Sequence, residues 1–209
     1  MKKAVLFDID GTLLDAWNFI FDAVKHTVSE HGQPYPSVKL IRKALGKPLL
    51  EFYTIALPAA DPEMLAKTHH QFQQQNFSLI KLFPKAKSTL KRIKDKGFLL
   101  AAVSNRSRGS LIRSLKLTGI FKYFDVIVSA EDVVNPKPHQ EHLLTALKHL
   151  KVKPMNAFII GDTDKDILAG KNAGVKTIGV TYGFLGEEIK KYEPDFVIDD
   201  IEGILDIVK

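Results

Sequence analysis

The chain contains no cysteine among its 209 residues, so disulfide bonds and thiolate metal sites are excluded. It has no uninterrupted apolar run near the roughly 20 residues that a membrane-spanning helix requires. Neither a Gly-x-Gly-x-x-Gly dinucleotide loop nor a Gly-x-x-x-x-Gly-Lys-Ser/Thr phosphate loop occurs. No small-residue cleavage site follows the initial Met-Lys-Lys. These absences lead us to expect a cytoplasmic protein that has no membrane partner.

Positive charge is in excess, with a formal net charge of +6 and a pI near 9.3. The densest basic segment, residues 85–96, places Leu90 and Ile93 at helical spacing and its lysines on the remaining faces. Aromatic residues do not alternate with the basic ones, as single-strand nucleic-acid binding would require. We therefore expect a solvated helix face, no nucleic-acid partner, and a field that attracts anionic substrates.

Short, nearly continuous runs of apolar and β-branched residues predict buried strands. They lie at residues 4–7, 98–103, 126–129, 157–160, 177–181 and 196–198. Helical patterns separate the later strands, at residues 84–97, after Ser107, from about Pro138 and over 164–173. This alternation predicts an α/β fold with a doubly wound, mostly parallel sheet.

Residues 15–81 interrupt the alternation because they contain helical patterns only. Prolines and glycines divide the segment into stretches near 17–28, 38–45, 49–57 and 62–77. We predict a catalytic core domain of residues 1–14 and 82–209, with an inserted helical cap domain over 15–81 that can act as a lid. Asp15 is expected to cap the first cap helix. The aromatic residues Trp17, Phe21, Phe52 and Tyr53 are expected in the cap core.

Two carboxylates stand two residues apart where the first strand ends, at Asp8 and Asp10, and Gly11-Thr12 then breaks the strand. Side chains at i and i+2 of a strand share one face, so both can converge on a point beyond the sheet. Two like charges at such a point repel each other unless a proton or a cation intervenes. The pair therefore favours a divalent metal site.

Three further polar elements follow predicted strands or loops at the same edge of the sheet. They are Ser104-Asn105, Lys137 between two prolines, and the turn Gly161-Asp162-Thr163-Asp164-Lys165-Asp166. Ligands of doubly wound sheets bind beyond the carboxyl ends of the strands. Carboxylate oxygens suit Mg²⁺, and a fixed ammonium with a hydroxyl suits a phosphoryl group.

With these four elements in this order, the chain resembles the haloacid dehalogenase superfamily, in the branch similar to phosphoglycolate phosphatases. The resemblance covers essentially the whole chain, including a helical cap after the first motif. It implies a nucleophilic Asp8 that forms an aspartyl-phosphate, and an Asp10 that acts as general acid and then general base. It implies a Mg²⁺ site formed by Asp8, the backbone carbonyl of Asp10 and Asp162, supported by Asp166, where Mn²⁺ or Co²⁺ can substitute.

The same resemblance assigns phosphoryl binding to Ser104, Asn105 and Lys137. The implied activity is Mg²⁺-dependent hydrolysis of a small anionic phosphorylated metabolite, a phosphomonoester such as 2-phosphoglycolate, by a monomer or homodimer. Same-fold alternatives are a pyrophosphatase, a sugar or nucleotide phosphatase and a phosphomutase. Mutases of this branch have a cap histidine about twelve residues after the nucleophile, where this chain has Ile20. A receiver-like signalling module is an alternative from another class, but it lacks a helical insert.

The residues that select the substrate remain open at this stage. Lys47, in the turn Leu45-Gly46-Lys47-Pro48, is a candidate for meeting a carboxylate or a second phosphate. Arg106 either reaches the substrate or faces solvent. His139 and His142 are three residues apart on a predicted helix, but no third ligand accompanies them, so we do not expect a metal there.

Overall fold

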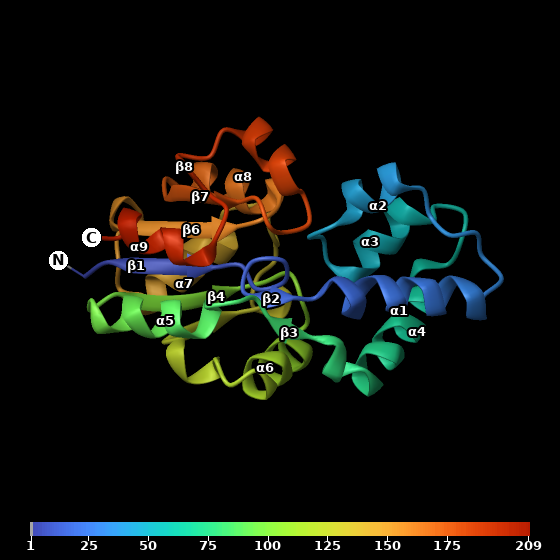
Figure 1. Ribbon diagram of the computed structural model, residues 1–209. Helices are drawn as coiled ribbons and strands as arrows, with labels where there is room; N and C mark the ends of the chain where they lie inside the picture. Colours follow the sequence, from blue (N-terminus) through green and yellow to red (C-terminus); the bar gives the residue numbers. More distant parts are fainter. Residues whose placement is uncertain (1) are drawn as a thin grey trace.

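A parallel six-stranded sheet forms the centre of the computed structural model, which describes residues 2–209 (Figure 1). In spatial order its strands are β5 (Val126–Val128), β4 (Leu99–Val103), β1 (Ala4–Phe7), β6 (Ala157–Gly161), β7 (Lys176–Val180) and β8 (Phe196–Ile198). Ala4 is in register with Leu99 on one side and with Ala157 on the other. The doubly wound, mostly parallel α/β fold is therefore confirmed.

Both faces of the sheet are buried, which explains why the strands read as continuous apolar runs. Val5 and Phe7 belong to one hydrophobic core, and Ala4 and Leu6 to the other, because successive strand side chains alternate. Helices α5 (Ala86–Asp95), α6 (Arg108–Leu117) and α9 (Ile204–Ile207) contribute to the first core, and α7 (Glu141–Leu150) and α8 (Asp164–Ala173) to the second. Short 3₁₀ helices lie at Phe77–Leu79, Phe121–Tyr123, Ala130–Asp132, Pro154–Asn156, Gly186–Tyr192 and Ile201–Gly203.

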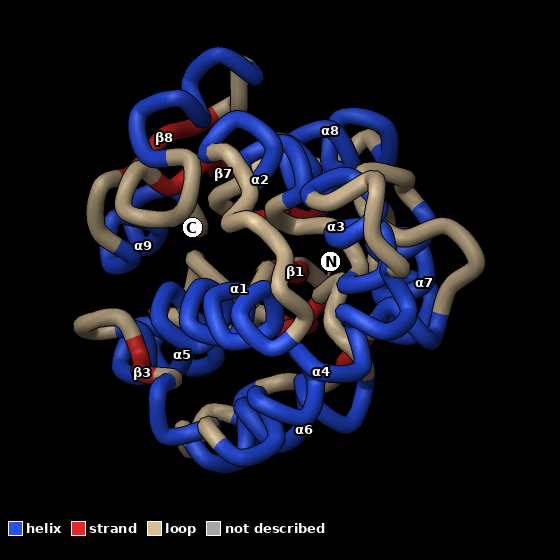
Figure 2. Tube along the Cα trace, turned by 90° about the vertical axis from the view of Figure 1, so that its right-hand side faces the viewer, coloured by secondary structure: helices blue, strands red, loops and turns tan. Residues whose placement is uncertain are grey.

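Four helices gather beyond the carboxyl ends of the strands (Figures 1 and 2). They are α1 (Trp17–Glu30), α2 (Val38–Ala44), α3 (Leu49–Ala56) and α4 (Pro62–Gln75). The chain enters and leaves this group through a short antiparallel pair, β2 (Leu14–Asp15) and β3 (Lys81–Leu82). The predicted helices are present, whereas the domain boundaries at 15 and 81 stay a prediction. Within residues 2–209, none of the helices is both long and apolar enough to cross a bilayer.

The four helices enclose a hydrophobic core of their own that includes Val24, Phe52, Tyr53 and Leu65. The prediction of this core is wrong for Trp17, which is 50% exposed, and for Phe21, which packs outside the core. The Trp17 ring stacks on Phe21 at 4.2 Å, and the two rings lie 5.9 and 6.4 Å from Phe184 of the sheet domain. Trp17 therefore lies at the junction between the helices and the sheet. Asp15 accepts a hydrogen bond from the Trp17 backbone at 3.2 Å, at the start of α1.

His69 on α4 is buried against Tyr53, whose hydroxyl lies 2.8 Å from Nδ1 of the imidazole. Burial, with the nearby charges of His70 and Arg106, lowers the pKa of His69 to about 3. In an unfolded chain a histidine has a pKa near 6.5. Below pH 6.5 this histidine binds a proton in the unfolded state but not in the folded state. The free energy of unfolding therefore falls as the pH falls.

We expect His69→Gln to reduce the loss of unfolding free energy between pH 8 and pH 5 by about 2 kcal/mol, as proton linkage at this one site predicts. Urea denaturation at both pH values measures the difference. The exposed His149→Gln is the matched control and should keep the wild-type pH dependence. A parallel pH dependence in wild type and His69→Gln would contradict this origin of acid sensitivity.

Candidate active site

The first acidic residue follows β1 directly and faces the helical group. Asp8 continues the sheet, since its backbone N–H donates to the Ile160 carbonyl at 2.9 Å, and its side chain is largely buried. The chain then turns at Gly11, whose φ is +86°. A Cβ at Gly11 would lie 2.1 Å from Oδ2 of Asp162, so the turn requires glycine both for its conformation and for this close approach.

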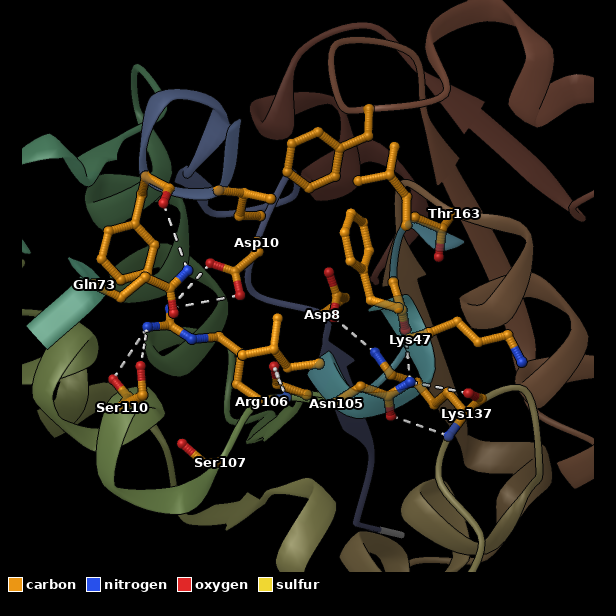
Figure 3. A pocket seen from close by; sticks show the side chains of 18 of the residues that line it. Asp8, Asp10, Lys47, Gln73, Asn105, Arg106, Ser107, Ser110, Lys137 and Thr163 are labelled. Carbon is orange, nitrogen blue, oxygen red and sulfur yellow. Dashed lines mark hydrogen bonds and ion pairs between the residues drawn. The ribbon is translucent and has the colours of Figure 1, made fainter. Parts of the chain in front are cut away.

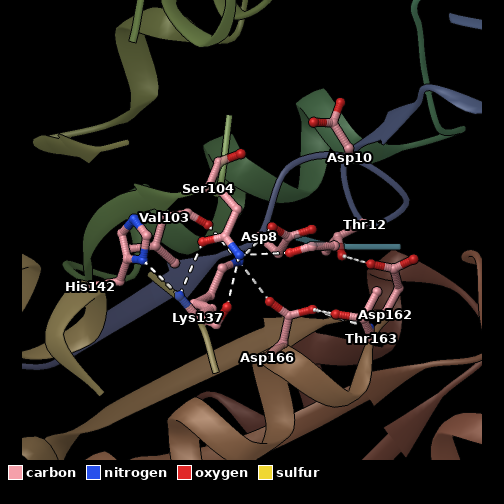
Figure 4. Close-up of polar contacts among 12 residues, drawn as sticks. Asp8, Asp10, Thr12, Val103, Ser104, Lys137, His142, Asp162, Thr163 and Asp166 are labelled. Carbon is pink, nitrogen blue, oxygen red and sulfur yellow. Dashed lines mark hydrogen bonds and ion pairs between the residues drawn. The ribbon is translucent and has the colours of Figure 1, made fainter. Parts of the chain in front are cut away.

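The ammonium of Lys137 lies in the middle of the polar cluster (Figure 4). Nζ is 2.7 Å from Oδ1 of Asp8, 2.7 Å from Oδ1 of Asp166 and 2.9 Å from the Val103 carbonyl oxygen. Burial lowers the pKa of Lys137, but the charges of Asp166 and Asp8 outweigh it and raise the pKa above its usual value. Lys137 is therefore a fixed positive charge beside Asp8.

Three buried carboxylates, those of Asp8, Asp162 and Asp166, place one oxygen each within 4.8 Å of the others. Burial raises the pKa of Asp8 to about 7, although Lys137 opposes the shift. Burial, together with the charges of Asp8 and Asp166, also raises the pKa of Asp162. One ammonium thus does not neutralise the cluster. An all-carboxylate site with excess negative charge fits a hard divalent cation such as Mg²⁺.

The Asp10 carboxylate does not join this cluster. Its Oδ1 and Oδ2 accept hydrogen bonds from Nη1 of Arg106 at 3.1 and 3.5 Å. The metal contact predicted for Asp10 involves its backbone carbonyl and not this carboxylate, and that role stays a prediction. Asp8 and Asp10 thus point to different sides of one site (Figure 3), one toward the ammonium and the other toward the guanidinium.

A cavity of about 420 Å³ lies above these residues, between the sheet and helices α1, α3 and α4 (Figure 3). The sheet side contributes its polar floor: Asp8, Asp10, Ser104, Asn105, Arg106, Lys137 and Asp166. The helical side contributes a largely apolar wall that includes Phe19, Ile20, Leu49 and Phe52. The arrangement can hold a small anionic molecule over Asp8, between the polar floor and the apolar wall.

The fold, the order of the motifs and the clustered acids are shared with a known protein family. Residues 5–180 match the family of haloacid dehalogenase-like hydrolases. This chain belongs to that family. The match spans five of the six strands of the sheet, leaving out β8, and it includes the helical insert and every polar residue of the site described above.

Individual relatives align with this haloacid dehalogenase-like chain over nearly its whole length. Pyrophosphatase PpaX of Halalkalibacterium halodurans is 35% identical over 207 residues, which cover 99% of this chain and 96% of the relative. A crystal structure of a predicted phosphoglycolate phosphatase from Haemophilus somnus has a TM-score of 0.92 at 24% identity, covering 100% of this chain and 98% of that one. A haloacid dehalogenase-like hydrolase from Streptococcus pneumoniae has a TM-score of 0.87 at 25% identity, with 100% and 99% coverage.

Ser104 and Asn105 lie where this haloacid dehalogenase-like fold ends β4, and both line the cavity. The Ser104 hydroxyl accepts a hydrogen bond from the Arg106 backbone at 3.2 Å. Nδ2 of Asn105 donates to the carbonyls of Gly46 at 2.6 Å and Lys137 at 2.9 Å, and Oδ1 accepts from the Lys137 backbone at 3.1 Å. Asn105 thus connects a turn of the helical group to the loop that carries Lys137. Its contact with a phosphoryl group stays a prediction.

Several residues organise the site although no such role was predicted for them from the sequence. The Phe184 backbone donates to Oδ2 of Asp162 at 2.7 Å, and Thr163 donates its hydroxyl to Asp166 at 2.7 Å. Buried His142, whose pKa is lowered to about 4 by burial and the Lys137 charge, accepts a hydrogen bond from the Lys137 backbone at 3.2 Å. Of these residues, only Thr163 could have been recognised from the sequence, because a threonine three residues before an acid is typical of a helix N-cap.

Lys47 lines the cavity, as a substrate-selecting residue would. Its ammonium, however, forms an ion pair with Glu51 on the next turn of α3. Gly46, which precedes it at a φ of +74°, packs against Thr163 of the sheet domain. The turn therefore contacts the site mainly through its backbone.

Proposed function

We propose that this protein is a Mg²⁺-dependent phosphohydrolase that works through an aspartyl-phosphate on Asp8. The observation that supports this most is the contact of Asp8 with Lys137 at 2.7 Å on the cavity floor, beside the acidic cluster. A carboxylate that attacks an anionic phosphoryl group must overcome charge repulsion, and the neighbouring ammonium offsets it. Ser104 lies at the same floor, where its hydroxyl can donate to a phosphoryl oxygen.

The two acids divide the reaction between them. An oxygen of Asp8 forms a bond to phosphorus while the bond to the leaving oxygen breaks, and Asp10 gives its proton to that oxygen. Asp10, now ionised, takes a proton from a water that attacks the phosphoryl group, which frees Asp8 and releases phosphate. Arg106 holds Asp10 on the cavity side of the turn for both steps.

Asp8, Asp162 and the backbone carbonyl of Asp10 would hold the metal, with Asp166 in support. When bound, Mg²⁺, or Mn²⁺ or Co²⁺ in its place, would supply positive charge that stabilises the transferring phosphoryl group. The burial of these three carboxylates and the raised pKa values of Asp8 and Asp162 support this assignment.

The substrate is a small anionic phosphorylated metabolite. A phosphomonoester resembling 2-phosphoglycolate suits the cavity, and pyrophosphate is the second candidate, because relatives named pyrophosphatase PpaX align along the whole chain. Ile20 occupies the cavity wall where a mutase of this branch would carry histidine, which favours hydrolysis over phosphoryl transfer between sugars. We infer a cytoplasmic monomer or homodimer.

Phosphate release from pyrophosphate, 2-phosphoglycolate, glucose 6-phosphate, AMP and an aryl phosphate tests the function. We expect turnover of at least one of the first two with Mg²⁺, and at least a roughly 100-fold lower rate with EDTA. Release that is indifferent to EDTA, or no turnover on the whole panel, would overturn the proposal. A stable phosphoprotein without turnover would instead favour the receiver-like module.

A further inference from the structure

Arg106 is a cationic side chain that lines the cavity beside Asp10, the acid proposed to protonate the leaving oxygen (Figure 3). It follows β4 and is only 15% exposed at its side chain. Nη2 is anchored on Ser110, to its hydroxyl and to its backbone carbonyl at 3.4 Å, and the guanidinium lies 5.0 Å from the centre of the Phe19 ring. The side chain is thus fixed between the sheet domain and α1, rather than facing solvent.

The guanidinium retains donor capacity beyond these contacts. Arginine has five N–H donors in a planar fork. Nη1 shares its bonds between the two oxygens of Asp10, and Nη2 points to Ser110. Within residues 2–209, Nε of Arg106 has no hydrogen-bond partner. A second anion that arrives beside Asp10 can therefore be bound without displacing Ser110.

The two lysine side chains that line the cavity already have carboxylate partners away from Asp10. Lys137 has two carboxylates and a carbonyl oxygen around its ammonium, below the position of the transferred phosphoryl group. Lys47 is paired with Glu51. Arg106, in contrast, touches the residue that protonates the leaving oxygen. A charge on the leaving group would thus be within reach of Arg106 and not of Lys137.

We propose that Arg106 determines specificity by binding a negatively charged group on the leaving group. The preferred substrates are then phosphoryl compounds with an anionic leaving group, either the phosphoester of a short hydroxy acid or pyrophosphate. This inference rests on the proposed phosphohydrolase function and adds the chemical class of the leaving group. The apolar wall of Phe19, Leu49 and Phe52 strengthens such a contact, because it keeps water from the guanidinium.

A matched pair of substrates isolates the charge. 2-Phosphoglycolate and 2-hydroxyethyl phosphate have alkyl leaving groups of nearly equal size, and differ by a carboxylate in place of a hydroxymethyl group. We expect wild type to prefer 2-phosphoglycolate by about 10- to 100-fold in kcat/KM, the range for a charged hydrogen-bonded pair. Pyrophosphate, assayed in parallel, distinguishes a carboxylate from a second phosphate as the anion.

Because Arg106 also holds Asp10, Arg106→Gln should lower kcat on both esters by a similar factor. It should in addition raise KM for the charged substrate, so that the preference is lost, and Arg106→Lys should restore part of the preference. Arg108→Gln is the control, because Arg108 lies two residues further along the chain, at the start of α6, and pairs with Asp132 outside the cavity. An equal loss of kcat/KM on both esters in Arg106→Gln would overturn the proposal and leave Arg106 as a positioning residue for Asp10. If the wild-type enzyme showed no preference for anionic leaving groups, the role of Arg106 would be overturned but the phosphohydrolase function would stand. If it hydrolysed none of the three compounds, the proposed function itself would be contradicted.

Discussion

Replacing Asp8 by Asn should lower kcat with an aryl phosphate by at least about 10⁴-fold, the scale on which loss of a catalytic nucleophile is felt. The amide cannot form the acyl phosphate, although it fits the same space at the end of β1. Lys137 keeps Asp166 as a partner at 2.7 Å, so the variant should fold. Steady-state rates with Mg²⁺ measure the loss. Acid quenching with radiolabelled substrate should trap labelled protein in wild type and none in Asp8→Asn.

Asp15→Asn is the matched control for this substitution. Asp15 is exposed, lies at the start of α1 and contacts the Trp17 backbone rather than the cavity. Its turnover should stay within a few-fold of wild type. Near-wild-type rates for Asp8→Asn would exclude Asp8 as the nucleophile, whatever the metal requirement proves to be.

Replacing Lys137 by Met should destabilise the protein by about 3–5 kcal/mol in EDTA, because carboxylates of the buried acidic cluster lose their cation. Added Mg²⁺ should recover part of this loss, since an ion that binds only the folded state stabilises it. Turnover should fall as well, because the attack by Asp8 loses the charge beside it. Denaturant titrations with EDTA and with Mg²⁺, at one pH near 8, measure both effects.

Lys165→Met provides the comparison, because Lys165 is also a buried lysine of this region. Its ammonium pairs with Asp164, which is partly exposed, and not with the acidic cluster. We expect a smaller loss than for Lys137→Met, and one that Mg²⁺ does not recover, because Lys165 pairs with a single carboxylate that water can reach. A Lys137→Met protein as stable in EDTA as Lys165→Met would show that Lys137 does not compensate the buried acids.

Strand and helix positions were largely predictable, because burial on both faces leaves a continuous apolar run in each strand. The predictions for residues 4–7 and 196–198 coincide with β1 and β8, and that for 164–173 coincides with α8. β2 and β3 were missed because two residues cannot display a period. Helix α7 begins at Glu141, not near Pro138, since the Glu141 carboxylate accepts hydrogen bonds from the Val134 and Asn135 backbones and holds the preceding loop.

The acidic residues of the site could be predicted because they follow strands, and strand ends meet at one edge. The pairing of Asp10 with Arg106 could not, since it depends on a side-chain rotamer and on Ser110 one helical turn away. Likewise, the hydrogen bond from Phe184 to Asp162 joins segments with no common pattern. Backbone donors carry no residue signature, so a sequence does not reveal them.

The central position of β1 has a consequence for how the protein is made. β1 leaves the ribosome before any of its neighbours, yet it pairs with β4 and β6, and the latter ends just before Asp162. Asp8 is therefore synthesised long before the lysine and acids that surround it. Sheets built from such distant partners fold slowly, because long loops must close first. A nascent chain that has not yet reached α8 carries the Asp8 carboxylate without Asp162 and Asp166, so the acidic cluster can form only after α8 has been synthesised.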